Sequence, residues 1–230
     1  SDEPGFDIAA GVVGVTGVCG SAIIEVVAEM FLAGIISEDG VVDGSLAAKS
    51  ERIVEDGRTF SYVLWRGQQE LKITQNDVRA IQLAKAALYA GIKLLMDKQG
   101  IENVDSISFA GAFGTFIDPK YAMVLGLIPD CDLSKVNAVG NAAGYGAKMA
   151  LLNRGYRREI EETVTRIEKI ETALEPEFQA HFVNAMAMPN KIDPFPKLGE
   201  QVNLPQKKAT PNAANDDGTG GRRRRRRARG

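Results

Sequence analysis

Apolar residues recur at helical spacing over residues 75–98, and this is the clearest pattern along the chain. The apolar positions lie three, seven, four and three residues apart: Val78, Ile81, Leu88, Ile92 and Leu95. This spacing puts them on one helical face, so we expect the stripe to belong to the core. Thr74 can cap the helix, with Asp77 at the third helical position as a variant of the capping box, and Gly100 stops it.

The N-terminal part of the chain predicts a strand or loop, a turn and a helix. Residues 8–15 are apolar and rich in glycine, and a glycine-containing turn follows at residues 16–21. Beyond the turn, apolar residues fall on one broad helical face. We expect this helix to have Ser21 as its N-cap and Gly34 near its end.

Short strands and helices follow along the rest of the chain. The runs at residues 52–55 and 59–65 predict a β-hairpin that turns at Asp56-Gly57-Arg58. The other predicted elements are, in order, a strand at 106–109, a helix from Asp118 or Pro119 to Leu125, a short run at 133–136, a helix that opens at 139–146 and ends near Asn153, a charged amphipathic helix at 157–174, and a helix at 177–186. Beyond Pro189 the chain is rich in Pro, Asn, Lys, Gly and Arg, which predicts disorder.

Composition and charge narrow the class of protein. With 230 residues, 44% hydrophobic and 25% charged, the chain is typical of a soluble globular protein of one domain or two small ones. The segment from Asn190 carries eleven basic and four acidic residues, a net +7, which leaves −9 on the preceding body. An acidic body with a basic tail argues against nucleic-acid binding by the folded part.

The remaining composition signals concern compartment and processing. Cys19 and Cys131 are too few and too far apart in sequence for a disulfide framework or a CxxC metal site, so we expect a reducing, cytoplasmic setting. No apolar run reaches the roughly 18 to 20 residues of a membrane span. The N-terminus has no secretory signal and no initiator methionine, which predicts a fragment or a processed product.

Three glycine-rich turns are the candidate chemistry of this chain. They lie at residues 17–21, 111–114 and 140–146, and each leads from strand-like sequence into a helix. Glycine allows a ligand to approach the backbone closely, and helix N-terminal amides suit phosphate or ribose oxygens. None is a Walker A loop or a GxGxxG fingerprint. Taken singly, each turn is more typical of tight strand-to-helix packing than of a ligand site.

The order of the motifs is more specific than any one of them. A long amphipathic helix is followed by a strand ending in Ala110-Gly111-Ala112-Phe113-Gly114, then by residues 117–129, and then by the Gly-Ala-rich residues 140–147. This order resembles the adenosine-motif half of the acetate and sugar kinase, Hsp70 and actin (ASKHA) superfamily. The implied fold is α/β, the C-terminal half of an actin-like, ribonuclease H-like nucleotide-binding domain with additional C-terminal helices.

Within that superfamily, six motifs in the family's order resemble the C-terminal domain of the reductive activators of corrinoid proteins. They are residues 16–21, 32–36, 73–79, 82–87, 110–114 and 139–144. The segment 176–189 is also similar to that family's closing helix. We therefore expect a nucleotide-binding domain portion over residues 1–189 and a disordered basic tail over residues 190–230.

The resemblance implies the function of a complete protein of which this chain is part. Members of that family use ATP to return an inactive Co(II) corrinoid on a partner protein of a methyltransferase system to Co(I). The implied cofactors are ATP and Mg²⁺, with a [2Fe-2S] cluster only in an N-terminal domain missing from this chain. The implied partner is a corrinoid protein. A homodimer is allowed, and no membrane association is expected. We expect the complete protein to be an ATP-hydrolysing activase and this part alone to be inactive.

Two departures and one substitution qualify the resemblance. The chain lacks a four-cysteine cluster pattern, and it lacks the Asp-x-Gly-Thr phosphate signature, so the phosphate and Mg²⁺ ligands are expected upstream. Ala22 stands where the family usually has a second glycine.

Site residues are carried over position by position from the resemblance. The adenosine would face Gly111, Ala112, Phe113 and Gly114, while Gly17, Gly20 and Ser21 would lie beside the nucleotide cleft, with Gly140, Asn141 and Gly144 as second-line candidates. No catalytic acid or base is assigned, and Asp118 before Pro119 is more typical of a helix cap.

Two other functions stay open at this stage. One is a different enzyme on the same fold, such as a small-molecule kinase or an activator of another metalloenzyme. The other is a non-catalytic module that docks a partner through the acidic body or the Arg222–Arg229 tail.

Overall fold

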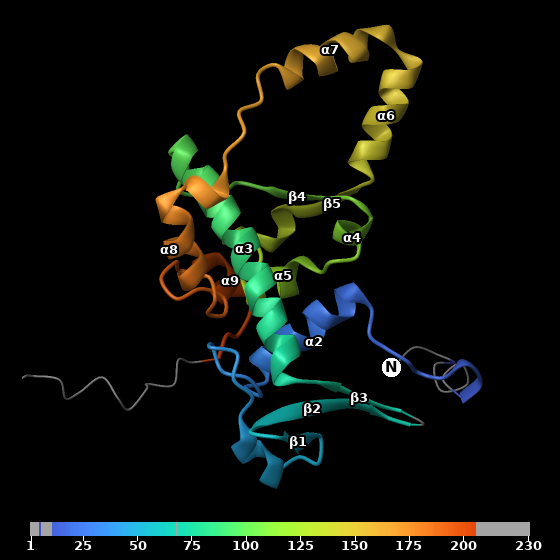
Figure 1. The fold of residues 1–230 in the computed structure, drawn as a ribbon, viewed down its shortest axis with the longest axis vertical. Coiled ribbons are helices and arrows are strands. Elements are labelled where there is room, and N and C mark those ends of the chain that lie inside the picture. Colours follow the sequence, from blue (N-terminus) through green and yellow to red (C-terminus); the bar gives the residue numbers. More distant parts are fainter. Residues whose placement is uncertain (1–4, 6–10, 68, 206–230) are drawn as a thin grey trace, which may run out of the picture.

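A helix of 25 residues, α3 (Gln75–Gln99), runs through the middle of the fold (Figure 1). The computed structural model describes residues 5, 11–67 and 69–205. The predicted capping box is confirmed, because the Thr74 hydroxyl accepts from the Asp77 amide at 3.1 Å and the Asp77 carboxylate accepts from the Thr74 amide at 2.8 Å. Gly100 ends the helix in the left-handed conformation with φ 64°.

The buried face of α3 differs from the predicted apolar stripe. Val78 is fully buried, but Leu88 and Leu95 are 48% and 53% exposed, so the prediction was wrong for these two leucines. The face of α3 that the rest of the chain covers includes Gln82 and Lys85, which are polar, together with Ala86, Tyr89, Ala90 and Leu94. Helix α8 (Pro176–Asn184) and the segment after it cover this face, and backbone carbonyls there accept hydrogen bonds from the buried polar side chains.

Helix α2 (Gly20–Leu32) begins two residues earlier than expected. Its N-cap is Cys19 rather than Ser21, and no side chain caps its first turn. Gly34 follows its end with φ 69°, as predicted. The predicted strand or loop at residues 8–15 lies partly outside the described residues, and residues 11–13 are helical.

The first sheet is antiparallel and consists of β1 (Ile53–Asp56), β2 (Thr59–Arg66) and β3 (Glu70–Ile73). A 3₁₀ turn, Gly44–Ala48, packs against it. The predicted hairpin is confirmed, because Asp56 pairs with Thr59 across the two-residue turn. Strand β3 was not predicted.

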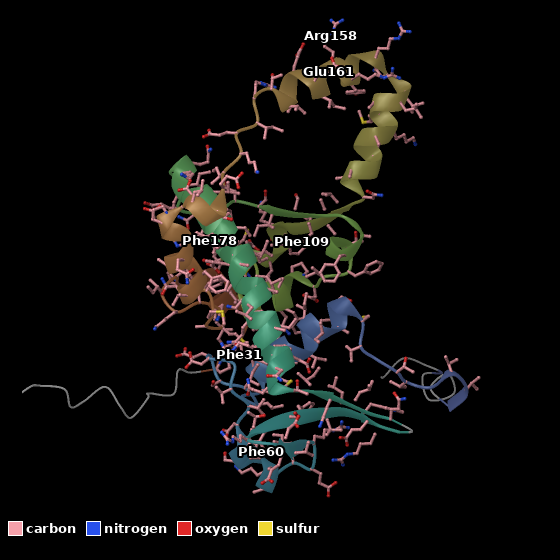
Figure 2. The ribbon with its side chains drawn as sticks, viewed as in Figure 1. Phe31, Phe60, Phe109, Arg158, Glu161 and Phe178 are labelled. Atoms are coloured by element: carbon pink, nitrogen blue, oxygen red, sulfur yellow. The ribbon has the colours of Figure 1, made fainter. Side chains whose placement is uncertain are left out.

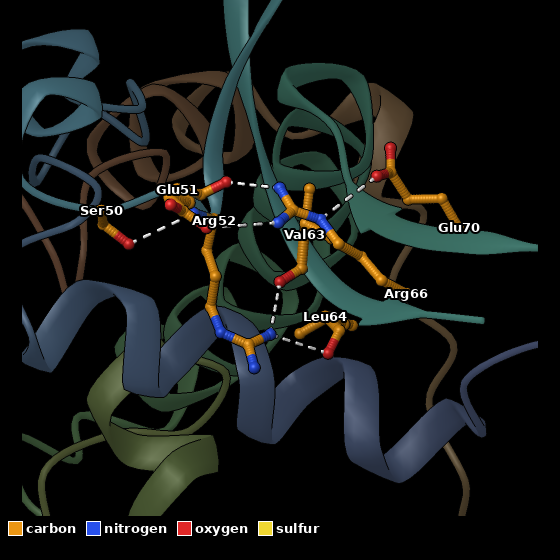
Figure 3. Close-up of polar contacts among 7 residues, drawn as sticks. All are labelled: Ser50, Glu51, Arg52, Val63, Leu64, Arg66 and Glu70. Carbon is orange, nitrogen blue, oxygen red and sulfur yellow. Dashed lines mark hydrogen bonds and ion pairs between the residues drawn. The ribbon is translucent and has the colours of Figure 1, made fainter.

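Two arginines connect neighbouring strands at the open end of this hairpin (Figure 3). Arg52 donates to the carbonyls of Val63 and Leu64 at 2.9 and 3.0 Å, where the β2–β3 register shifts. Arg66 donates to the carbonyl of Glu51 on β1's side and lies 3.6 Å from the Glu70 carboxylate of β3. Arginine's several donors let one side chain satisfy groups on both sides of a strand.

The second sheet is parallel and consists of β4 (Ile107–Ala110) and β5 (Val136–Gly140). Between them lie α4 (Ala112–Thr115), α5 (Pro119–Leu125) and a 3₁₀ turn, Leu133–Lys135. The Asp118 side chain caps α5 as expected, since it accepts from the Lys120 amide at 2.8 Å. Helix α5 packs against α2. Figure 2 labels Phe31 of α2 and Phe109 of β4.

An arm of two helices, α6 (Ala142–Leu152) and α7 (Arg154–Val164), extends from the end of β5 (Figure 1). The helix predicted at 157–174 is therefore shorter, and a separate 3₁₀ turn covers Thr172–Leu174. Three β-branched residues, 163–165, close α7, and the Thr165 hydroxyl donates to the Glu162 carbonyl at 2.7 Å. Such local bonds offer the backbone an alternative to continuing the helix.

The predicted boundary between folded domain and disordered tail, at residue 190, was placed too early. Residues 190–205 belong to the folded body, and they include α9 (Pro196–Gln201). Phe195 and Leu198 are 8% and 0% exposed. The Asp130 carboxylate accepts from the amides of Lys197 and Leu198 and so caps α9. Val202 and Leu204 also pack, partly buried, against the core. The Pro-, Asn- and Lys-rich composition predicted disorder because it does not show these contacts or the distant cap from Asp130. Residues 206–230 lie outside the described residues.

The fold as a whole is α/β, with helices packed on two small sheets, as expected. Among the helices of the described residues, none has the length and apolar character needed to cross a membrane.

Candidate functional site

The carboxyl ends of β4 and β5 bring two of the glycine turns together. The Gly111 amide donates to the Gly140 carbonyl at 2.7 Å, just beyond the last pair of the parallel ladder. Both glycines have positive φ, 96° and 69°, which a residue with a side chain adopts only with strain. Turns that follow neighbouring parallel strands meet at one sheet edge, which is where ligands bind in open α/β sheets.

The third glycine turn reaches the same place through α2. A Cβ added to Gly20 would lie 2.9 Å from the ring of Phe113, so the start of α2 is packed directly against α4. Phe113 itself is 56% exposed. The structure therefore brings residues of all three predicted turns together at the carboxyl ends of β4 and β5, with the Phe113 ring between the first turn and the second.

Asn141 and Gly144 form the start of α6. The Asn141 side chain accepts from the Gly144 amide at 2.9 Å and caps the helix. A Cβ at Gly144 would lie 2.7 Å from the Asn141 side-chain nitrogen, so glycine there makes room for the cap. Gly114 has a comparable packing reason, since its Cβ would lie 3.1 Å from that of Phe109.

The start of α2 places a thiol at the positive end of the helix dipole. The Cys19 Sγ lies 3.5 Å from the Ser21 hydroxyl. This hydrogen bond, with the Ala22 amide, lowers the pKa of the exposed Cys19 thiol. Neither α2 nor α6 has an acidic residue in its first turn, so the positive end of each helix dipole is not neutralised locally.

Gly17 and Ala112 are less informative than the other predicted residues. Gly17 is exposed, with open space around it, and the structure does not bring it against another turn. Ala112 is exposed in the first turn of α4.

The chemistry available at this edge is that of backbone amides, glycine surfaces and one aromatic ring. These groups suit the phosphate and sugar oxygens and the base of a nucleotide. No carboxylate is among the ten predicted site residues. Asp118 is occupied in capping α5. These ten positions therefore offer groups that suit a nucleotide but no acid or base.

Metal and cluster ligands do not fit the described residues. No group of three or more His, Cys, Asp or Glu that could hold a metal ion occurs in the described part of the chain. The chain has two cysteines, Cys19 exposed and Cys131 buried, whereas a [2Fe-2S] cluster takes four ligands. We therefore assign neither a Mg²⁺ site nor an iron–sulfur site to the described residues.

A polar contact between α2 and α5 supports the site, and it was not predicted from the sequence. The Tyr121 hydroxyl donates to the Glu29 carboxylate at 2.6 Å, and the Lys120 ammonium lies 3.6 Å from the same carboxylate. Glu29 raises the pKa of Tyr121 to about 12. Since α2 carries Gly20 and α5 follows the 111–114 turn, this contact links the supports of two site turns. No sequence spacing could reveal a contact between residues 92 positions apart.

A second missed feature is the latch that holds the C-terminal segment on α3. Gln82 donates to the Met186 carbonyl at 2.9 Å, and Lys85 donates to the carbonyls of Ala187 and Pro189. Lys85 is buried and burial lowers its pKa to about 7. A lysine and a glutamine within a helical pattern are usually exposed to solvent. The sequence therefore gave no indication that these two side chains are buried.

Comparisons with known proteins agree on one family. A family model described as the C-terminal domain of RACo, the ASKHA domain, matches residues 2–199. A curated protein from Eubacterium limosum named corrinoid activation enzyme RamQ is 34% identical over 186 residues, which is 74% of this chain and 31% of that protein. A solved structure named reductive activator for corrinoid, iron-sulfur protein is similar with a TM-score of 0.67 and 32% identity, over 78% of this chain and 30% of that chain. The chain thus spans about a third of the length of these relatives.

Proposed function

Because the chain belongs to the family of the C-terminal ASKHA domain of RACo, we propose that it supplies the adenosine side of an ATP site in a reductive activator of corrinoid proteins. The complete activator would pass one electron from its [2Fe-2S] cluster to a Co(II) corrinoid held by a corrinoid protein of a methyltransferase system, giving Co(I), and would use ATP hydrolysis to drive this uphill transfer. The proposed setting is the cytoplasm, with Mg²⁺ and the [2Fe-2S] cluster held outside this chain.

The observation that carries the proposal is the meeting of the three glycine turns. The Gly111–Gly140 bond and the Gly20–Phe113 contact put residues from three separate motifs at one edge. Phe113 and the 111–114 turn would face the base and ribose, and the α2 and α6 N-termini would face phosphate oxygens. ATP hydrolysis would supply the driving force for the electron transfer, and these residues would bind and orient the ATP.

The names of the relatives support the choice of substrate. One relative is named a corrinoid activation enzyme and the other a reductive activator for a corrinoid, iron-sulfur protein, and both match most of this chain at about one third identity. In the part of the chain that the structure describes, no group of His, Cys, Asp or Glu could hold a redox metal centre. We therefore propose that this part binds the nucleotide and transmits its bound state.

A chimera tests the proposal directly. This chain would replace the matching C-terminal part of the Eubacterium limosum relative, and reduction of a Co(II) corrinoid protein would be followed by its absorption spectrum with and without ATP. We expect ATP-dependent formation of Co(I), lost on Gly111→Val and kept on Gly57→Ala, a turn glycine remote from the site. A folded chimera that reduces the corrinoid equally well without ATP would refute the nucleotide role.

A further inference from the structure

The latch on α3 holds the C-terminal segment by its carbonyl groups. Gln82 donates to the carbonyl of Met186, and Lys85 donates to the carbonyls of Ala187 and Pro189. Gln82 and Lys85 are each 1% exposed. A buried polar contact of this kind stabilises the closed arrangement only while its donors and acceptors match.

The same short stretch of chain also contacts the ends of α2 and α5. The Met188 amide donates to the carbonyl of Glu38, in the loop that follows α2, at 2.9 Å. At the end of α5, a Cβ added to Gly126 would lie 2.0 Å from the Pro189 carbonyl oxygen, so the two backbones are in close contact. The latch therefore joins three helices, two of which support turns of the proposed site.

The number of acceptors at the latch matches a neutral lysine. Two carbonyls accept from the Lys85 nitrogen. A neutral amine has two N–H donors, whereas an ammonium has three, so a charged Lys85 would keep one buried donor without a partner among the described residues. Burial lowers the pKa of Lys85 to about 7, which agrees with this count. The closed latch thus favours the neutral form, and water favours the charged form.

Charged groups on the elements around the latch have other partners. Asp193 accepts from the Tyr89 hydroxyl at 2.8 Å, and the Asp130 carboxylate accepts from two amides of α9. From α8, His181 lies 2.8 Å from Asp97 of α3. Protonation of His181 would strengthen that contact at acid pH, which is the opposite sign to the effect of protonating the latch lysine.

The segment held by the latch can leave without disturbing a sheet. Residues 186–199 follow the last strand of the described chain and pair with none of its strands. Several of their hydrogen bonds are local: the Asn190 side chain accepts from the amides of Ile192 and Asp193, and the Gly199 amide donates to the Phe195 carbonyl. Contiguous units of this kind can open while the rest of a protein stays folded.

We propose that the latch is proton-linked: residues 186–199 leave α3 as a unit when the Lys85 amine takes up a proton from solvent, while the rest of the fold stays closed. The proposal is independent of the nucleotide site. Opening moves the new ammonium into water, where all three of its donors find acceptors. Gln82 carries no proton to exchange and holds its carbonyl in the same way at every pH.

The sign of the effect follows from the two states of Lys85. Its pKa is about 7 in the closed latch and returns toward 10.5 when the segment opens. Between these values the open state binds one more proton, so each unit fall in pH raises the open fraction about tenfold. Below the lower value both states are protonated, and the open fraction no longer changes with pH.

Hydrogen exchange followed by mass spectrometry on the 230-residue chain, from about pH 6 to 9, tests the proposal. After correction for the intrinsic exchange rate at each pH, protection of residues 186–199 should be flat below neutrality and rise about tenfold per pH unit above it. Amides at the centre of α3, such as those of Ala90 and Leu94, should stay better protected at each pH. Equal protection of the two regions would mean that the segment opens only with the whole fold, and would overturn the proposal.

Variants at the lysine separate the proton from the packing. Lys85→Gln keeps two N–H donors and takes up no proton, so protection of residues 186–199 should lose its pH dependence. Lys85→Arg stays charged, and protection there should be flat and low. His181→Gln and the exposed Lys49→Gln are controls that should keep the wild-type slope.

The slope against pH, rather than the level of protection, decides the outcome. A wild-type chain without a slope above neutrality, a Lys85→Gln chain with the wild-type slope, or a slope that His181→Gln abolishes would each overturn the proposal. If neither Lys85 variant folds, the wild-type and His181→Gln slopes still decide, because His181 is the other proton-binding side chain between α8 and α3 that could produce one.

Discussion

The buried Lys85 ammonium donates to the Pro189 carbonyl at 2.9 Å and thereby ties α3 to the C-terminal segment. A second carbonyl of the same segment, that of Ala187, accepts from the same nitrogen. No carboxylate forms an ion pair with Lys85 in the described part of the chain. Only backbone carbonyl dipoles therefore stabilise the charged form of Lys85. The free-energy cost of burying this charge should make the stability of the protein depend on pH.

The stability of the protein should rise with pH above neutrality because of Lys85. Burial lowers its pKa from 10.5 to about 7. Between these two values the unfolded chain binds more protons than the folded one, so this residue raises the free energy of unfolding as pH increases, by at most about 1.4 kcal/mol per pH unit. Below the folded pKa both states are protonated and its contribution is constant.

Urea unfolding of wild type and Lys85→Met from pH 6 to 9.5 measures this contribution. The difference between the two proteins should be flat below pH 7 and should grow in favour of wild type above it. Lys49→Met, at an exposed position, is the control and should run parallel to wild type. Parallel curves for Lys85→Met as well would show that the lysine keeps its ordinary pKa.

Gly126 should tolerate no side chain. It ends α5 with φ 74°, and an added Cβ would lie 2.0 Å from the Pro189 carbonyl oxygen. Gly126→Ala should therefore cost more than the roughly 1 kcal/mol of a strained φ alone. Gly57→Ala is the matched control, because Gly57 has φ 65° with nothing near its Cβ position. Chemical denaturation that gives equal losses for the two variants would argue against close packing at Pro189.

Removal of residues 190–230 should destabilise the protein more than removal of residues 206–230 alone. The shorter truncation product lacks Phe195 and Leu198, each of which contributes about 2 kcal/mol when fully buried. It also leaves the Asp130 carboxylate without the two amides that it accepts from. Thermal unfolding of the 1–189 and 1–205 chains compares the two directly; a 1–189 chain as stable as the 1–205 chain would mean that the segment is not part of the core.

The chain alone should bind ATP weakly or not at all. The described residues supply one side of the proposed site and no metal-binding cluster, so the phosphates would lack most of their charge neutralisation. Calorimetric titration should show no dissociation constant tighter than about 1 mM. A micromolar constant would mean that this part carries a complete site.

Local elements could be predicted from the sequence because their signals are local. The Thr74–Asp77 capping box, the Gly57 turn and the proline start of α5 each depend on residues a few positions apart. The three glycine turns were also found, although only their order, through a family resemblance, suggested that they meet.

Features that depend on distant contacts could not be predicted. Leu88 and Leu95 look like core in the helical pattern, but α8 and the latch cover the face of Gln82 and Lys85 instead. The folded state of residues 190–205 depends on Asp130, which is 67 positions from Lys197. In each case a polar side chain is satisfied by the backbone of a remote segment, a pairing that spacing along one element does not encode.

The Gly20–Phe113 contact should control nucleotide binding without controlling stability. A Cβ at residue 20 would press on the Phe113 ring at 2.9 Å, and the ring is 56% exposed and free to turn away. In the chimera described above, Gly20→Ala should therefore cost less than about 1 kcal/mol of stability while raising the ATP concentration needed for half-maximal activity. Phe113→Leu removes the clashing ring atoms. If the contact acts through the ring, adding Gly20→Ala to Phe113→Leu should have little further effect, and the two changes will be strongly non-additive. Additive losses would instead place Gly20 and Phe113 in independent roles.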